Sequence, residues 1–368
     1  MPDPDFFVAP DIPPVMVSLE PAHNVIYSLL LLTKAEKMSG LGEWVMRTAR
    51  ALTPKEREML RLVTAGFYYA LVPEQSWPSF PAYLEHLAAC DPTALRDKLL
   101  RSYARFPPSD GSECKDMGPE PLPIDQEAVL ADADAYVGFL RKRFAPSNLD
   151  EALEARAYTY VVDPPAMKKL IVSQLQGIWE KHLRAEWERV RPMLQDAVTA
   201  FRQIDLSNLS KVEAAKEIIG HELDEEKTQA FEQAERLVFI PSSHIGPYLW
   251  KFHTDDALQV LFGARLPRGV QFSAPDLSRA EILVRLNALA DSNRLHILQL
   301  ISEEGEQRSQ DVIDRLALSQ STVSRHLKQL VATGYLVERR CNGAKCYKLN
   351  PEQITDTLQA ISTLLLGS

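Results

Sequence analysis

Two amphipathic helical patterns separated by only two residues constrain the fold of this chain more than any other feature. The first spans residues 309–317 and the second residues 320–330. Apolar residues of the second pattern recur at i, i+4 and i+7 and so share one buried helical face: Val323, Leu327 and Leu330. Ser319 stands where an N-cap is needed, because its hydroxyl can accept from the amide of Thr322. This spacing predicts a helix-turn-helix.

The residues that follow predict a β-hairpin. Gly334 occupies the position just past the second helix, where glycine favours the end of a helix. Strand-like residues 335–341 and 344–349 then flank Asn342-Gly343, and Asn-Gly is a strong two-residue turn signal. A basic hairpin directly after the second helix is a wing, so the order of elements predicts a winged helix-turn-helix.

The outer face of the second helix is polar and suits base edges and phosphates in a major groove. An ordinary surface helix with a polar face is the alternative. Charge favours DNA, since residues 319–350 carry six Lys or Arg against Glu338 alone, whereas the whole chain has a net charge of −9. The predicted DNA-binding residues are Ser319, Gln320, Ser321, Thr322, Ser324, Arg325, His326, Lys328, Arg339, Arg340, Asn342 and Lys345.

Three segments together resemble the ArsR family of dimeric winged-helix transcriptional regulators, most of which are repressors. These segments are Leu289–Leu298, Leu318–Leu330 and Gly334–Val337. The resemblance covers residues 277–366 and implies a homodimer in which the first and last helices of the domain pair across a two-fold axis. Two apolar stripes fit that expectation, with intradomain core as the alternative: Ile282, Leu286, Leu289, Ile354, Leu358, Ile361 and Leu365.

The first 275 residues carry the whole net charge of −9, because residues 276–368 contain 11 Lys or Arg and 11 Asp or Glu. No run of 18 apolar residues occurs, and the start of the chain lacks the basic stretch of a signal peptide. We therefore expect a cytoplasmic protein with no membrane partner. Four cysteines in 368 residues do not make a disulfide framework.

Periodicity predicts a mainly α fold, with a large helical N-terminal domain and a small β-sheet near its end. We assign residues 1–266 to this domain, with an internal break at 106–125, and residues 277–368 to the winged helix. Residues 1–17 are predicted to be extended, and residues 265–275 to be a linker. Predicted helices cover 25–37, 44–52, 54–71, 80–90, 92–106, 126–144, 149–162, 166–201 (broken or kinked at Pro192) and 210–236. Predicted strands cover 237–240, 246–252 and 258–262.

Catalytic and cofactor motifs were sought, and none was found. In the family, metal sensors carry a Cys-x-Cys on the first helix of the helix-turn-helix, or ligands including histidine on the last helix. Here residues 308–313 lack cysteine and residues 351–366 lack histidine, so we predict no metal site, cofactor or catalytic residue. Cys341 and Cys346 should lie diagonally on one face of the hairpin, farther apart than a relaxed disulfide prefers. Packed, inert thiols are expected there, and a redox switch is the alternative.

The sequence thus predicts a non-enzymatic, DNA-binding transcriptional regulator that acts as a homodimer on a near-palindromic operator. The alternative is a small-molecule-binding protein or enzyme built on the N-terminal domain, with the winged helix used for association. Residues 1–266 either receive an effector, as an organic ligand or a protein, or only stabilise the dimer. Both alternatives stay open at this point.

Overall fold

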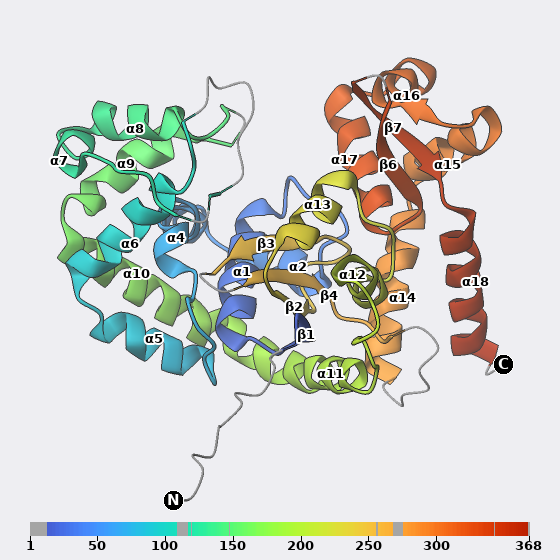
Figure 1. Cartoon of the computed structure of the whole chain (residues 1–368), viewed down its shortest axis with the longest axis horizontal. Helices are drawn as coiled ribbons and strands as arrows, with labels where there is room; N and C mark the ends of the chain where they lie inside the picture. Colours follow the sequence, from blue (N-terminus) through green and yellow to red (C-terminus); the bar gives the residue numbers. More distant parts are fainter. Residues whose placement is uncertain are drawn as a thin grey trace, which may run out of the picture.

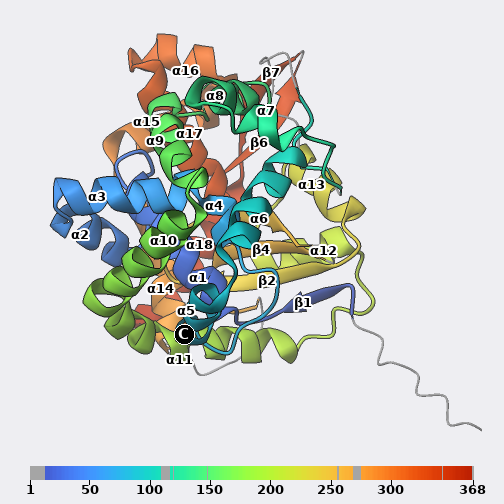
Figure 2. The ribbon, with the colours of Figure 1, turned by 90° about the vertical axis from the view of Figure 1, so that its left-hand side faces the viewer.

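The computed structural model describes residues 13–108, 117–118, 120–146, 148–254, 257–267, 275–341 and 343–366, with the side chains of 275–277 left out. The helical N-terminal region occupies the left and centre of Figure 1, and the C-terminal winged helix stands at the right. Figure 2 shows the same arrangement from the side of the helical region. The fold class predicted from the sequence is confirmed.

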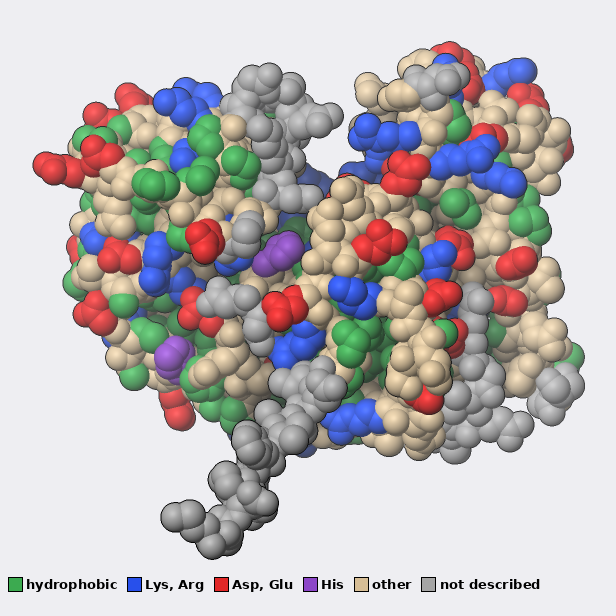
Figure 3. Space-filling view, in the orientation of Figure 1, with side chains coloured by type: hydrophobic (Ala, Val, Ile, Leu, Met, Phe, Trp, Pro, Cys, Tyr) green, Lys and Arg blue, Asp and Glu red, His purple; other side chains and the backbone are tan. Residues whose placement is uncertain are grey.

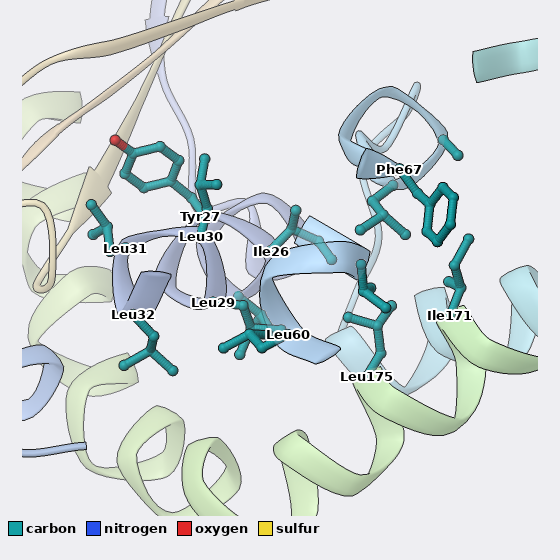
Figure 4. Packing of buried hydrophobic residues seen from close by; sticks show 14 of the residues in the cluster. Ile26, Tyr27, Leu29, Leu30, Leu31, Leu32, Leu60, Phe67, Ile171 and Leu175 are labelled. Carbon is teal, nitrogen blue, oxygen red and sulfur yellow. The ribbon is translucent and has the colours of Figure 1, made fainter. Parts of the chain in front are cut away.

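The N-terminal helices pack around α1 (Pro21–Lys34), which is buried along most of its length. Figure 4 shows its Leu29 close to Leu60 of α3, with Leu175 of α10 nearby. The surrounding elements are α2 (Glu43–Ala51), α3 (Pro54–Arg61), a π-helical turn (Leu62–Gly66), α4 (Tyr68–Leu71), α5 (Phe80–Ala89), α6 (Pro92–Ala104), α7 (Gln126–Val129), α8 (Ala133–Arg141), α9 (Glu151–Val161) and α10 (Pro164–Ile178). A second π-helical turn (Trp179–Leu183) joins α10 to α11 (Arg184–Arg202), and α12 (Lys211–Ile219) and α13 (Glu225–Gln233) follow.

A four-stranded sheet lies inside this region in the order β1-β2-β4-β3. Its strands are β1 (Val15–Val17), β2 (Leu237–Ser242), β3 (Trp250–His253) and β4 (Leu258–Gly263). β1, β2 and β4 are parallel, and β3 is antiparallel to β4. Side chains of alternate faces enter two different cores, one shared with α1 and one with α11, α12 and α13. The predicted sheet is therefore present, and residues 15–17 of the predicted N-terminal extended segment join it as an edge strand.

Four long helices predicted from periodicity are interrupted. The predicted helix 54–71 passes through the π-helical turn Leu62–Gly66, which separates α3 from α4. Asp132 caps a new helix and so divides the predicted helix 126–144 into α7 and α8. Gly220 at φ 85° ends α12 and divides the predicted helix 210–236. The predicted helix 166–201 changes to π-helical geometry at Trp179–Leu183, whereas Pro192 lies inside α11 and does not break it. Periodicity alone does not detect these local changes.

The C-terminal elements have the order of a winged helix-turn-helix. They are α14 (Pro275–Leu289), α15 (Ser292–Glu304), β5 (Gln307–Arg308), α16 (Ser309–Leu316), α17 (Gln320–Ala332), β6 (Leu336–Cys341), β7 (Ala344–Leu349) and α18 (Pro351–Leu366). The small sheet has the order β5-β7-β6. Its core is separate from the N-terminal cores and gathers residues of α15, α16, α17 and the hairpin.

Of the predicted linker 265–275, residues 268–274 lie outside the described part of the chain, and its first residue is anchored by contacts on both sides. Arg265 is 6% exposed and donates to the carbonyl oxygen of Glu217, 3.1 Å away. Its Nε also lies 3.4 Å from a carboxylate oxygen of Glu281 in α14. Arg265 therefore holds the C-terminal end of α12 and the first helix of the winged helix together. At the predicted break 106–125, the helices on both sides share one core.

Candidate nucleic-acid interface

The recognition helix, α17, begins at a capped turn. The hydroxyl oxygen of Ser319 accepts from the amide of Thr322 at 3.2 Å, as the sequence predicts. Ala317 ends α16 in the left-handed region at φ 49° and reverses the chain direction between the two helices. Val323, Leu327 and Leu330 are buried against the winged-helix core. The opposite face of the same helix is therefore turned outward.

That outward face carries most of the predicted DNA-binding residues. Ser319, Gln320, Ser321, Ser324, Arg325 and Lys328 are exposed, and Thr322 is half-buried. Figure 3 shows Lys and Arg side chains gathered around α17 and the hairpin, beside a hollow that separates them from the helical region. Short hydroxyl and amide groups with flanking cations can read base edges and neutralise phosphates.

His326 does not belong to that face. The sequence analysis placed it beside the polar residues, but the structure leaves its side chain only 3% exposed. Neither ring nitrogen has a hydrogen-bond partner, and burial, with Arg294 and Arg325 nearby, lowers the pKa of His326. The ring is therefore neutral and buried near neutral pH. The inclusion of His326 among the DNA-contacting residues is corrected for this reason.

The hairpin has the register expected of a two-residue turn: Cys341 pairs with Ala344, and Arg339 with Cys346. Arg339, Arg340 and Lys345 are all exposed, whereas Asn342 lies outside the described residues. Two of these cations have acidic partners. Arg339 donates from Nη2 to Oε2 of Glu306 at 2.5 Å, and Lys345 Nζ lies 2.5 Å from Glu338 Oε1.

A cleft of about 320 Å³ separates the hairpin and the recognition helix from an acidic segment of the N-terminal region. The acidic segment is residues 222–226, and its side chains Glu222, Asp224, Glu225 and Glu226 line one wall. The opposite wall contains Lys328, Arg339, Arg340 and Lys345. Desolvation lowers the pKa of Lys345, but a hydrogen bond and the charge of Glu338 raise it by more. Asp224 makes a smaller contribution in the same direction. The charge of Asp224 thus acts across the cleft on Lys345, a cation that was predicted to meet DNA.

Sequence reasoning missed this contact between the two regions. Tyr248, which donates to the carbonyl oxygen of Ser39 within the N-terminal region at 2.7 Å, lies close enough to the winged helix for the charges of Arg294 and Arg325 to act on its phenol. Gln329, on the recognition helix, is fully buried and packs on Gly40. The excess of acidic residues before position 276 was visible in the sequence, but its position opposite the hairpin depends on how the regions pack.

Only part of the apolar surface predicted to form the dimer interface is exposed to solvent. Ile282 is 6% exposed and is already buried within its own chain, which corrects its assignment to an interface. Leu289 and Ile354 are half-buried and pack against the winged-helix core, and Ile361 is half-buried. By contrast, Leu286, Leu358 and Leu365 are 37%, 61% and 74% exposed. Together with exposed Leu283, Leu364 and Leu366, they leave an apolar surface on α14 and α18, which pack together at the right of Figure 1.

The sequence predicted no metal site, yet the structure brings together side chains that could bind an ion. Among the described residues, one group could hold an ion: Glu306, Cys341 and Cys346, whose ligand atoms all lie within 4.8 Å of one another. Glu306 was missed because it is far from both cysteines in sequence.

In the described part of the chain, no helix is both long and apolar enough to cross a membrane.

Comparison with known proteins agrees with this geometry. The family profile described as "Bacterial regulatory protein, arsR family" matches residues 291–337. The arsenical resistance operon repressor of Staphylococcus aureus is 33% identical over 88 residues, which cover 24% of this chain and 84% of that protein. The repressor of the same name from Staphylococcus xylosus is 34% identical over 90 residues, or 24% of this chain and 86% of that protein. The arsenic resistance transcriptional regulator ArsR1 of Pseudomonas putida is 42% identical over 64 residues, covering 17% of this chain and 50% of that protein.

No solved structure shows significant similarity to the chain. The winged helix-turn-helix with its polar recognition helix defines a DNA-binding transcriptional regulator. The chain belongs to the arsR family of bacterial regulatory proteins. Each of these relatives matches at most 24% of the chain, so they leave the N-terminal region without a counterpart.

Proposed function

We propose that this regulator is a repressor that binds a near-palindromic operator as a homodimer. The observation that carries the proposal is the exposed face of α17, with Gln320, Ser324 and Arg325 on the side opposite its buried residues. In this arrangement α17 enters the major groove, and the wing meets the backbone or minor groove. The names of the staphylococcal relatives support repression. The proposal assigns no enzymatic activity to the chain.

A second copy of the chain is the proposed occupant of the apolar surface on α14 and α18. Leu358 and Leu365 are among the most exposed large apolar residues of the described chain, and an isologous contact would bury them in both copies. Two-fold symmetry sets the two recognition helices about 34–36 Å apart, which matches successive major grooves. Leu358→Glu should give a monomer by sedimentation, and Leu295→Glu, which changes an exposed leucine of α15, is the matched control.

Binding to DNA upstream of the chain's own coding region is the first test. Footprinting with the full-length protein should protect two half-sites about one helical turn apart. The Leu358→Glu variant should protect neither half-site at the same concentration. A single protected half-site with the wild-type protein, or equal protection by both proteins, would contradict the dimeric arrangement.

We also propose that the N-terminal region receives an effector. A groove of about 720 Å³ lies between α4 and α6 on one side and β3 and α13 on the other, with Tyr68, Trp250 and Phe252 in its lining. Glu226, near the start of α13, lines both this groove and the cleft that faces the wing. A ligand in the groove can therefore move the acidic segment and change the position of the recognition helices. Stabilisation of the dimer alone is the competing role for this region.

A protein-free cell extract tests this role. It should release operator DNA from the wild-type protein and release less from Trp250→Ala, because Trp250 lies in the groove. Trp77→Ala is the matched control, since the Trp77 ring lies against His86 in a tilted arrangement and is not part of the groove lining. Equal release from all three proteins would favour a purely stabilising role for residues 1–266. Reciprocal linkage also requires that DNA weaken the binding of any such ligand.

A further inference from the structure

Three side chains able to bind a metal ion meet at the base of the wing, although they come from three separate segments. Cys341 ends β6, Cys346 lies within β7, and Glu306 directly precedes β5. One carboxylate oxygen of Glu306 and the two sulfur atoms all lie within 4.8 Å of one another. These positions differ from residues 308–313 and 351–366, which correspond to the family's usual metal-binding positions.

The pairing of the strands explains why these residues meet. Arg339 of β6 and Arg308 of β5 both pair with Cys346, which brings β5 and β6 to opposite sides of β7. Arg339 also holds the carboxylate of Glu306 through two hydrogen bonds, one of them 2.5 Å long between Nη2 and Oε2. The cluster is therefore built from the sheet register and from an ion pair, and not from a chance approach of mobile side chains.

We propose that Glu306, Cys341 and Cys346 form a binding site for a thiophilic divalent cation, with Zn²⁺ as the best match. Bonds of about 2.3 Å to sulfur and about 2.0–2.2 Å to oxygen in a tetrahedron place ligand atoms about 3.4–3.8 Å apart. The present spacing, within 4.8 Å, needs only a small contraction. Cys346 is buried whereas Cys341 and Glu306 are half-buried, so solvent can supply the fourth ligand.

The charges around the cluster act on a bound cation in opposite directions. A hydrogen bond with Cys346, then partial desolvation and, more weakly, the negative charges of Cys346 and Glu306 raise the pKa of the Cys341 thiol. Two cations, Arg339 and, more weakly, Lys348, lower the pKa of Glu306 and oppose a bound ion. Loss of both thiol protons offsets the two positive charges of the ion, so the net charge of the cluster is unchanged. Binding should therefore strengthen as the pH rises.

The consequence for DNA rests on the function proposed above. Glu306 serves both as the partner of Arg339 and as a ligand of the ion, and an oxygen bound to Zn²⁺ is a weaker acceptor for the guanidinium. Arg339 is exposed and lies in the wing, so its release provides another group for a phosphate. Occupation of the site should therefore tighten DNA binding.

The site itself is tested on the free, full-length protein, without DNA, under a reductant that does not bind metal. Titration with Co²⁺ should produce the absorption of a tetrahedral cobalt–thiolate complex, and Zn²⁺ should abolish it. Cys341→Ser and Cys346→Ser should each lose this absorption, and Glu306→Gln should weaken Co²⁺ binding by at least about tenfold. Cys90→Ser is the matched control, because its thiol lies near His86 and outside the cluster, and it should bind like the wild type.

Circular dichroism of each variant checks that the fold is intact. Co²⁺ absorption that survives both cysteine variants, or no thiolate absorption in the wild type, would overturn the site. Disulfide formation in air without Co²⁺ binding under reductant would overturn it equally and indicate a redox role.

The coupling between the metal site and DNA is tested separately. Zn²⁺ should tighten DNA binding about three- to tenfold and raise the salt slope by about one unit. Arg339→Ala should remove that increase, and an unchanged increase in this variant would refute the release of Arg339. If wild-type Co²⁺ binding is normal but no DNA is bound, the proposed function fails while the metal site stands.

Discussion

The side-chain amide of Gln329, on the recognition helix, packs directly on Gly40 of the N-terminal region. Gly40 has φ 78°, and a Cβ atom added there would lie 2.6 Å from Nε2 of Gln329. Gln329 is fully buried and donates to Oδ1 of Asn287 at 3.4 Å, so it cannot simply turn toward solvent. The two regions therefore contact each other through the helix that is proposed to read DNA.

Gly40→Ala should weaken this contact. The substitution combines a left-handed backbone with a steric overlap, so we expect a loss of about 1–3 kcal/mol in the free energy of unfolding. Amide exchange should also rise in residues 326–333. Gly177→Ala is the matched control: Gly177 lies inside α10 with open space around it, and alanine there should stabilise the helix by up to about 1 kcal/mol. Calorimetry that shows the same Tm change for both variants would contradict the contact.

The acidic segment should compete with DNA for the cations of the wing. Removing charge with Glu222→Gln and Glu225→Gln together should tighten DNA binding about two- to fivefold at low salt, and the difference should vanish at high salt. Glu232→Gln changes an exposed carboxylate near the C-terminal end of α13 and should have no effect. Fluorescence anisotropy across a salt series measures all three proteins. Weaker binding by the double variant would show that the segment supports the DNA complex instead of opposing it.

The winged helix could be predicted from the sequence because its signals are local. Ser319 caps α17, Gly334 ends it at φ 80°, and the hairpin has the register that a two-residue turn requires. Each of these features depends on residues a few positions apart, so propensity and spacing are sufficient. The outward polar face of α17 followed from the same periodicity, with His326 as the exception.

Contacts between distant segments could not be predicted in the same way. Helix periodicity continues through Gly220 and Asp132, yet the chain changes direction at both positions. The approach of Glu306 to Cys341 depends on the pairing of β5 with β7, and β5 has only two residues. The face of the recognition helix that packs on Gly40 depends on the position of the whole winged helix. A single sequence contains no local signal for these arrangements.

Glu154 should make stability depend on pH. Burial, with Asp150 nearby, raises the pKa of Glu154 to about 8, so the folded protein keeps this carboxyl protonated at neutral pH. The pKa of Glu154 is higher in the folded protein than in the unfolded chain. Its contribution to the free energy of unfolding is therefore fully present below about pH 4.5 and is lost as the pH rises toward 8. Glu154→Gln should therefore be more stable than the wild type at pH 9, by about 2–4 kcal/mol, and the gap should close by pH 5. Denaturant unfolding at several pH values measures this difference, and a gap that does not depend on pH would contradict it.

Lys345 should contribute to DNA binding without regard to sequence. It is an exposed cation of the wing, held near Glu338, and is suited to a phosphate contact. Lys345→Ala should weaken binding to operator and random DNA alike and lower the salt slope by about one unit. Lys142→Ala removes an exposed lysine just after α8 and serves as the control for net charge. A loss confined to operator DNA would indicate that Lys345 reads bases.

The affinity of Arg325→Ala for operator DNA tests the central claim most directly, because Arg325 lies on the exposed face of α17. The full-length variant, with Arg101→Ala on the surface of α6 as its control, is compared with the wild type by anisotropy and footprinting. If α17 reads the major groove, Arg325→Ala loses about 1–3 kcal/mol of specific binding while its Tm and dimerisation are unchanged. The Arg101→Ala control should then match the wild type. An unchanged affinity and footprint in Arg325→Ala would contradict the assignment of α17 as the recognition helix.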